Sequence, residues 1–246
     1  MALIHQQTHQ GTHYQIITAG NSVRLYTDKV LHSQYNHKTQ LTGSVWDLLF
    51  LPALVLPTTA PIRVLVLGVG GGAVLKMLNE YFNCSNITGI ELNPIHIQLA
   101  QDYFAVKGKE YELIEADAIE YVKNYRGEKF DLIIDDLFYE EEGEPMKVAS
   151  PDNCWLMHLY ALLKPQGVIA MNFVGRNAAF SAAPLHDQYL SRLLPNALHF
   201  TTPYYDNHVL AFSAADMSAR QIRQNIIQHP KLSKKRSLFR YRCVRL

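Results

Sequence analysis

A glycine-rich turn directly after a short apolar run constrains this chain more than any other feature of its sequence. Residues 63–67 (Arg-Val-Leu-Val-Leu) read as a buried strand, and Gly68-Val-Gly-Gly-Gly-Ala73 follows at once. Glycines in such a turn adopt positive φ and let a ligand approach the backbone. Helical apolar spacing begins after Ala73, so unpaired N–H groups of a helix start face the turn. The motif fits either a nucleotide-type site or a tight strand–helix turn without a ligand.

The segment after this turn alternates between β-rich runs and helical spacing. The further β-rich runs lie at 86–92, 111–114, 130–134 and 167–173. Asn93-Pro94 and Ser150-Pro151 each suit an N-cap followed by proline in the first helical turn. Such alternation with short links predicts an α/β, Rossmann-like fold with a mostly parallel sheet covered on both faces. Two later runs, 198–202 and 208–212, predict an antiparallel hairpin at the C-terminal edge of the sheet.

The remaining segments predict a three-part organisation. Residues 1–55 read as a small β-rich domain, with a hairpin around Ala19-Gly-Asn21 and a helix from Val45 that Pro57 stops. Residues 56–215 form the Rossmann-like cofactor-binding domain. Residues 216–246 are a basic C-terminal tail, for which a solvated or partly disordered end is favoured over a contact with RNA or an acidic partner.

Composition narrows the classes of function. The net charge of +1 argues against a general nucleic-acid or membrane-surface binder. The longest apolar stretch, 45–56, is too short to span a bilayer. Three cysteines without a CxxC spacing indicate reduced thiols, and hence a cytoplasmic protein. The histidines form no HExxH pair, and His5, His9 and His13 are spread along the start of the chain, so no metal site is expected.

Carboxylates follow the second and third strands of the predicted sheet. Ligands bind at the carboxyl ends of the strands in open α/β sheets. Glu91, with Leu92 beside it, stands where a carboxylate accepts hydrogen bonds from both hydroxyls of a ribose; alternatively it is a charge at the start of a helix. Asp117 suits an adenine amine, with the Ala118 N–H donating to a ring nitrogen, or it is the N-cap of the next helix.

The fourth strand ends in the adjacent pair Asp135-Asp136. Two carboxylates at a ligand-facing edge bind cations or amines, or act as a base. Because side chains alternate along a strand, only one of them is expected to face the ligand. A glycine turn, then Glu, Asp and Asp on four successive strand ends suits an adenosine followed by a reacting group better than it suits a dinucleotide.

These motifs resemble the spermidine synthase superfamily of polyamine aminopropyltransferases. The matching pieces are Val64–Gly72, Gly89–Leu92, Ala116–Ala118, Phe130–Asp136 and Leu162–Gly167. The resemblance implies an AdoMet-type cofactor, with Gly68, Gly70, Gly71, Gly72, Glu91, Leu92, Asp117, Ala118 and Asp135 around it. It also implies that Asp136 helps to deprotonate an attacking amine, and that the protein is a homodimer without a metal.

The chain departs from the family at positions that bind the amine groups. Gly71 stands where the family carries an Asp, and Asp136-Leu-Phe-Tyr-Glu140 lacks the second Asp of the family's DxxDP. His32 aligns with the usual Gln, and residues 41–43 with the usual Tyr-His-Glu. Buried ammonium groups without carboxylate partners are costly, so a diamine acceptor is disfavoured unless Glu140, Glu141, Glu142 and Glu144 replace the missing charge.

Three functions follow from this pattern. The first is an aminopropyltransferase-like enzyme that uses decarboxylated AdoMet or AdoMet and a small amine acceptor. The second is an AdoMet-dependent methyltransferase on the same fold, which Gly71 and Tyr139 favour. The third is a cofactor-binding homologue without turnover. The fold alone does not choose between them.

Overall fold

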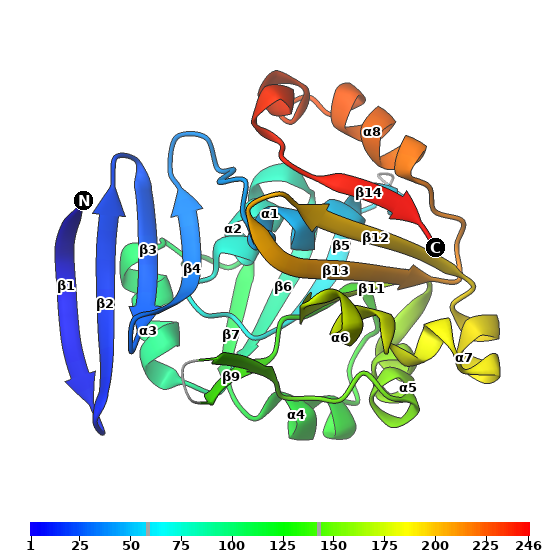
Figure 1. The fold of residues 1–246 in the computed structure, drawn as a ribbon, viewed down its shortest axis with the longest axis horizontal. Helices are drawn as coiled ribbons and strands as arrows, with labels where there is room; N and C mark the ends of the chain where they lie inside the picture. The colour runs from blue at the N-terminus through cyan, green and yellow to red at the C-terminus, as the bar shows by residue number, and fades with distance from the viewer. Residues whose placement is uncertain (58–59, 142–143) are drawn as a thin grey trace.

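The N-terminal residues form a four-stranded antiparallel sheet, at the left of the computed structural model in Figure 1, which describes residues 1–57, 60–141 and 144–246. Its strands pair in the order β1-β2-β3-β4. Tyr14 and Ile16 alternate with more exposed residues along β2, so one face of this sheet packs on the rest of the molecule. The expected hairpin around Gly20 is confirmed by the pairing of β2 with β3. The strands are β1 (Ala2–His9), β2 (Thr12–Ala19), β3 (Ser22–Thr27) and β4 (Val30–Asn36).

A second sheet of eight strands forms the centre of the molecule. Its order is β14-β12-β13-β11-β8-β5-β6-β7, parallel from β11 to β7 and antiparallel from β11 to β14. The Rossmann-like class and the antiparallel C-terminal edge are therefore confirmed. The strands are β5 (Ile62–Leu67), β6 (Cys84–Glu91), β7 (Tyr111–Glu115), β8 (Phe130–Asp135), β11 (Leu163–Val174), β12 (Asn196–Thr202), β13 (Tyr205–Ser213) and β14 (Arg242–Arg245).

Helices cover both faces of the central sheet. Val64 and Val66 of β5 point into one core, and Leu65 and Leu67 into a second core on the opposite face. Strands buried on both faces need this continuous apolar sequence. The first face carries α1 (Val45–Phe50), α2 (Ala73–Tyr81), α3 (Pro94–Tyr103) and α8 (Ala219–Gln228), and the second α4 (Ala118–Asn124), α5 (Asn153–Leu162) and α7 (Gln188–Leu193).

One of the two helix starts predicted from capping residues is confirmed and the other is wrong. The Asn93 side chain accepts from the Ile95 N–H and Pro94 opens α3, as predicted. The second predicted cap, Ser150-Pro151, is wrong. Asp152 caps α5 instead, because its carboxylate reaches the Trp155 N–H at 3.0 Å.

The short helical elements follow the same sequence logic. The helix expected from Val45 continues after Phe50 as a 3-10 turn, η1 (Leu51–Val55), in which Pro52 occupies an early position. Small helices α6 (Arg176–Phe180) and η2 (Ala183–Leu185) connect β11 to α7. A two-stranded hairpin, β9 (Phe138–Glu141) with β10 (Glu144–Lys147), follows β8 and has no counterpart in the sequence prediction.

The basic C-terminal segment is folded, unlike the solvated or partly disordered end that was favoured from the sequence. It comprises α8, η3 (Ser233–Leu238) and β14, which pairs antiparallel with β12. Its apolar residues alternate with the charged ones and reach the core: Ile222, Ile226 and Cys243 are buried. The division of the chain near residues 55 and 215 stays a prediction.

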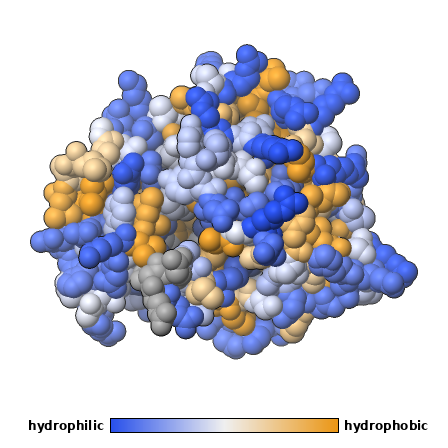
Figure 2. Space-filling model, viewed as in Figure 1, coloured by the Kyte–Doolittle hydropathy of each residue, from blue (hydrophilic) through white to orange (hydrophobic). Residues whose placement is uncertain are grey.

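The face seen in Figure 1 is mostly hydrophilic, with hydrophobic side chains gathered in separate patches (Figure 2). One patch lies over β1, where Met1, Leu3 and Ile4 are exposed. Within the described parts of the chain, no helix combines the length and the apolar character needed to cross a membrane.

Candidate functional site

A cleft of about 700 Å³ opens at the carboxyl ends of the central strands. Connections from β5 and β8 leave toward opposite sides of the sheet, which is the switch point where α/β proteins bind ligands. The N-terminal sheet closes the cleft from the other side through β3, β4 and the turn between them, including Thr27, Asp28 and His32. The cleft therefore lies between the two sheets rather than within either.

Some glycines of the turn line the cleft, and the others pack in the core behind it. Gly68 and Gly70 line the cleft, with φ of +86° and +53°. A Cβ on Gly68 would collide with the Asp136 carbonyl, and one on Gly70 would lie 2.8 Å from the His32 carbonyl oxygen. These two positions thus require glycine both for conformation and for close backbone approach.

The other two predicted glycines do not line the cleft. A Cβ on Gly71 would lie 2.7 Å from the Phe104 ring and 2.8 Å from the Ser33 Cβ. Gly72 precedes α2 as its N-cap, with φ of +77°, and packs against Val106. Of the four glycines predicted to bind a cofactor, the structure brings Gly68 and Gly70 to the site and packs Gly71 and Gly72 behind it.

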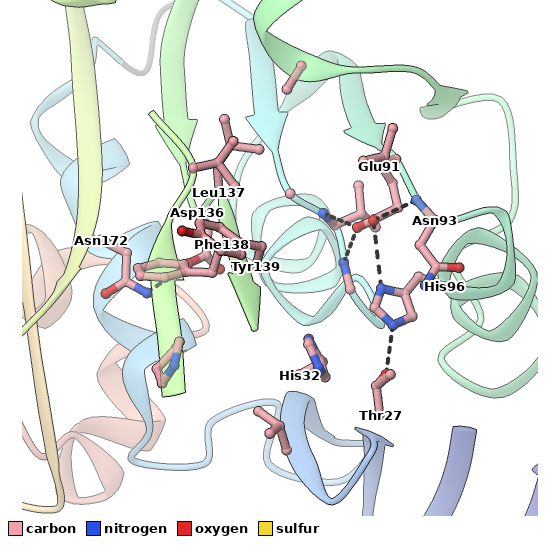
Figure 3. Close-up of a pocket in the computed structure, with 18 of the residues that line it drawn as sticks. Thr27, His32, Glu91, Asn93, His96, Asp136, Leu137, Phe138, Tyr139 and Asn172 are labelled. Atoms are coloured by element: carbon pink, nitrogen blue, oxygen red, sulfur yellow. Dashed lines mark hydrogen bonds and ion pairs between the residues drawn. The ribbon is translucent and has the colours of Figure 1, made fainter. Parts of the chain in front are cut away.

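Glu91 lies at the end of β6 and carries the most heavily bonded carboxylate of the cleft. One oxygen accepts from the N–H groups of Val69 at 3.0 Å and Gly70 at 2.9 Å, and the other from the Asn93 N–H at 3.0 Å. Burial opposes ionisation of this group. The His96 imidazole and the backbone donors outweigh burial and hold the pKa of Glu91 below its usual range. Glu91 is therefore an anion with an 11% exposed side chain that is bonded to the glycine turn and lies beside Asn93 and His96 in Figure 3.

Asp117 follows β7 and is exposed at the rim of the cleft. Its Oδ1 caps α4 by accepting from the Ile119 N–H at 2.7 Å and the Glu120 N–H at 3.3 Å. The capping alternative from the sequence is thus correct, and it does not exclude a ligand contact, because a carboxylate has two oxygens. Ala118 and Leu92 also line the cleft, and Leu92 is 69% exposed.

The adjacent carboxylates after β8 point to opposite sides, as strand alternation predicts. Asp135 is fully buried outside the cleft lining and accepts from Lys147 Nζ at 2.6 Å and Trp155 Nε1 at 2.8 Å. The structure therefore separates Asp135, a predicted cofactor-binding residue, from the cleft. Asp136 lines the cleft and accepts from Asn172 Nδ2 at 2.7 Å.

Asp136 has an unusual proton affinity for a carboxyl group. Burial raises its pKa to about 6, while the Asn172 hydrogen bond and the Lys147 charge oppose that rise. At neutral pH the group is ionised but close to its titration range, which is the condition for an efficient general base.

Sequence reasoning missed several residues that line the same cleft. Thr27 and His96 come from β3 and α3, and Asn172 and Asn207 from β11 and β13. His32, noticed only as the counterpart of a family Gln, also lines it. Burial, and secondly the neighbouring His96, lowers the pKa of His32 to about 4, so its ring is neutral at physiological pH. Among these residues, only His96 has a local sequence signal for its place near the cleft: it lies on the helix that Asn93 caps.

The acidic run after Asp136 is only partly described. Tyr139 lines the cleft and its hydroxyl donates to Glu141 at 3.4 Å. Glu142 lies outside the described residues, as do the side chains of Glu140 and Glu144. Replacement of the missing family carboxylate by this run stays a prediction.

Comparison with known proteins gives two kinds of relative. Residues 64–167 match the family described as "Methyltransferase domain". Polyamine aminopropyltransferase 2 of Caldanaerobacter subterraneus subsp. tengcongensis is 26% identical over 170 residues, which are 68% of this chain and 55% of that protein. The chain thus spans little more than half the length of this curated relative.

Solved structures agree on the fold at low sequence identity. A probable spermidine synthase from Corynebacterium glutamicum superposes with a TM-score of 0.74 at 13% identity, covering 99% of this chain and 91% of the other. Human Methyltransferase-like protein 13 in complex with SAH gives a TM-score of 0.62 at 18% identity, covering 78% and 91%. Both likenesses concern the fold.

Proposed function

We propose that this chain, a spermidine-synthase-like protein of divergent sequence, binds an AdoMet-type cofactor and transfers an aminopropyl group from it to an amine. One observation carries the proposal. The glycine turn, Glu91, Asp117 and Asp136 come from four different strand ends and line one cleft at the switch point of the sheet.

The residues present fit such a cofactor. Gly68 and Gly70 form a turn in which added side chains would block the approach of a ligand to the backbone. Glu91 would hold the ribose hydroxyls, because an ionised carboxylate accepts from a vicinal diol. Asp117 would accept from the adenine amine, with Ala118 and Leu92 beside the ring.

The bound sulfonium supplies an electrophilic carbon and a thioether leaving group. The protein's own part is to align the amine, to exclude water and to accept a proton. Asp136 would take that proton, since it is ionised above pH 6 and lines the cleft. Asn172 would fix the orientation of this carboxylate through its 2.7 Å hydrogen bond.

Methyl transfer is the second candidate, and Gly71 is the observation that favours it. The space that the family's Asp would need is filled by Phe104 and Ser33. Glycine at this position lifts the repulsion that the family's Asp would exert on the carboxylate of intact AdoMet, and it removes one partner of a decarboxylated cofactor's amine. The match to methyltransferase domains supports the same alternative.

Calorimetry with AdoMet, decarboxylated AdoMet, methylthioadenosine and NAD tests the cofactor class. We expect binding of at least one sulfonium and of methylthioadenosine. Binding of NAD alone would refute the proposal. A turnover screen with amines then separates the reactions: methylthioadenosine is released by aminopropyl transfer from the decarboxylated cofactor, and S-adenosylhomocysteine by methyl transfer.

The acceptor, the assembly and the compartment stay predictions. We propose a small amine as acceptor, a homodimer and a cytoplasmic location. Sedimentation velocity of the purified chain would test the dimer, and fractionation of the source cells would test the compartment.

A further inference from the structure

A buried chain of polar side chains joins the N-terminal sheet to Glu91 (Figure 3). Thr27 Oγ1, at the end of β3, lies 2.9 Å from His96 Nε2. His96 Nδ1, on the other side of the same ring, lies 3.7 Å from Glu91 Oε1. The three residues belong to β3, α3 and the end of β6. These contacts between side chains therefore form only when the two sheets have come together.

We infer that His96, held by Thr27, is a positioning residue that fixes the Glu91 carboxylate for recognition of a ribose diol. The inference rests on the proposed function, because it assigns to Glu91 the ribose of the nucleoside cofactor. The sequence motifs carry no signal for Thr27, and for His96 only its place on the helix that Asn93 caps.

Hydrogen-bond chemistry gives the ring a defined orientation. An ionised carboxylate attracts the positive end of an N–H dipole, so a hydrogen on Nδ1, 3.7 Å from Glu91, is favoured. In the neutral ring the opposite nitrogen then accepts from the Thr27 hydroxyl, which selects this tautomer. Tyr14 packs edge-on against the ring at 5.8 Å between centroids, and His32 lies 5.0 Å away. The imidazole is thereby held on several sides.

A second contact connects the same two regions. Asn93 Nδ2 donates to the Tyr14 hydroxyl at 2.9 Å, while the Asn93 N–H donates to Glu91. The segment after β6 is thus tied to β2 and β3 of the N-terminal sheet at two points. A diol donates to both carboxylate oxygens, so both oxygens must face it at once. The N-terminal sheet contributes to binding because it fixes the Glu91 carboxylate in that orientation.

The test is a thermodynamic cycle that combines a substitution in the protein with the removal of a hydroxyl from the ligand. Binding of methylthioadenosine and of its 2′-deoxy analogue is measured by calorimetry. Removing one hydroxyl that donates to a carboxylate should cost the native protein at least tenfold in affinity. In His96→Leu we expect weaker binding of methylthioadenosine and nearly unchanged binding of the deoxy analogue. The preference for ribose should therefore fall to about threefold or less, a coupling that only interacting groups show.

Conservative variants separate positioning from general disruption. His96→Asn places an amide donor near the Nδ1 position and should keep most of the ribose preference, whereas His96→Gln, which mimics Nε2, should lose it. Thr27→Val keeps the shape of the side chain without its hydroxyl and should reduce the preference in part; it also serves if His96→Leu does not fold. His9→Leu, an exposed histidine on β1, is the matched control.

Each outcome is distinguishable. Equal losses for both ligands in His96→Leu and Thr27→Val, or no loss in either variant, would overturn the positioning role. A native protein that binds methylthioadenosine without preferring ribose would overturn it as well. A native protein that binds neither ligand would instead refute the proposed function on which the inference rests.

Discussion

The side-chain amide of Asn172 on β11 donates a 2.7 Å hydrogen bond to Oδ1 of Asp136, the residue after the neighbouring strand β8. Asn172 Oδ1 accepts in turn from Asn207 on β13 at 3.2 Å. The bond uses one carboxylate oxygen and leaves acceptor capacity on Asp136 for a proton. It also stabilises the ionised form in a site where burial favours the protonated one.

Turnover should fall as the pH drops through about 6, because Asp136 acts as a base only when it is ionised. In Asn172→Leu the carboxylate loses a donor, so its pKa rises and the acid limb should move up by about one pH unit. Rate profiles between pH 5 and 9 would measure this. Identical limbs in the two proteins would argue against Asp136 as the titrating base.

Titration of Asp136 itself does not destabilise the fold over this pH range. The pKa of Asp136 in the folded protein lies above its ordinary value of 3.8, so protonation of this group stabilises the fold as pH falls from about 6 toward 3.8. Melting temperatures recorded over the same pH range provide the control.

Asp136→Asn should bind cofactor within about twofold of the native affinity and lose at least about 100-fold in turnover, the range for removal of a general base. The amide has the same shape but accepts no proton. Calorimetry and single-turnover rates would be measured together. Asp102→Asn, which alters a solvent-exposed carboxylate on α3, should leave both quantities unchanged. Retention of native turnover by Asp136→Asn would refute its role.

Glu91→Ala should weaken binding of the cofactor by about 1.5–3 kcal/mol, the usual value of hydrogen bonds to a charged group. Part of this loss will come from the N–H groups of Val69 and Gly70, which lose their acceptor. Titration calorimetry gives the free energy directly. Glu115→Ala is a matched control, because Glu115 ends the neighbouring strand β7, is exposed and does not line the cleft. Equal affinities for native protein and Glu91→Ala would exclude the ribose contact.

Gly71→Ala should lower the free energy of unfolding by about 1–3 kcal/mol, because the new methyl group overpacks the contact with Phe104 and Ser33. Urea unfolding would measure the loss. The double variant Gly71→Ala/Phe104→Leu should recover part of it if the clash with the ring is the cause. No recovery in the double variant would point instead to the contact with Ser33.

Local sequence signals were sufficient for the parallel part of the fold. Val64–Leu67 before Gly68 and Leu132–Ile134 before the aspartate pair are continuous apolar runs, and burial on both faces demands that pattern. The alternation of Asp135 and Asp136 between the two sides also followed from strand geometry. Local signals misplaced the cap of α5, since Ser150 and Asp152 both suit an N-cap and only coordinates distinguish them.

Long-range contacts account for what the sequence did not predict in the site. Thr27 and His96 are 69 positions apart and meet only through packing of the N-terminal sheet against α3. The prediction of a solvated or partly disordered C-terminal segment is wrong for a similar reason. Its charge suggested solvation, but Cys243 and its apolar neighbours have a place in the core that only the edge strand β12 provides.

The contact between Gly68 and the Asp136 backbone has a consequence for engineering this protein. The Asp136 N–H donates to the Leu67 carbonyl, and no side chain fits between Gly68 and the Asp136 carbonyl. A side chain at Gly68 would therefore displace the Asp136 backbone and, with it, the carboxylate that is proposed as the base. Under the proposed function, one substitution there would alter both cofactor binding and proton transfer.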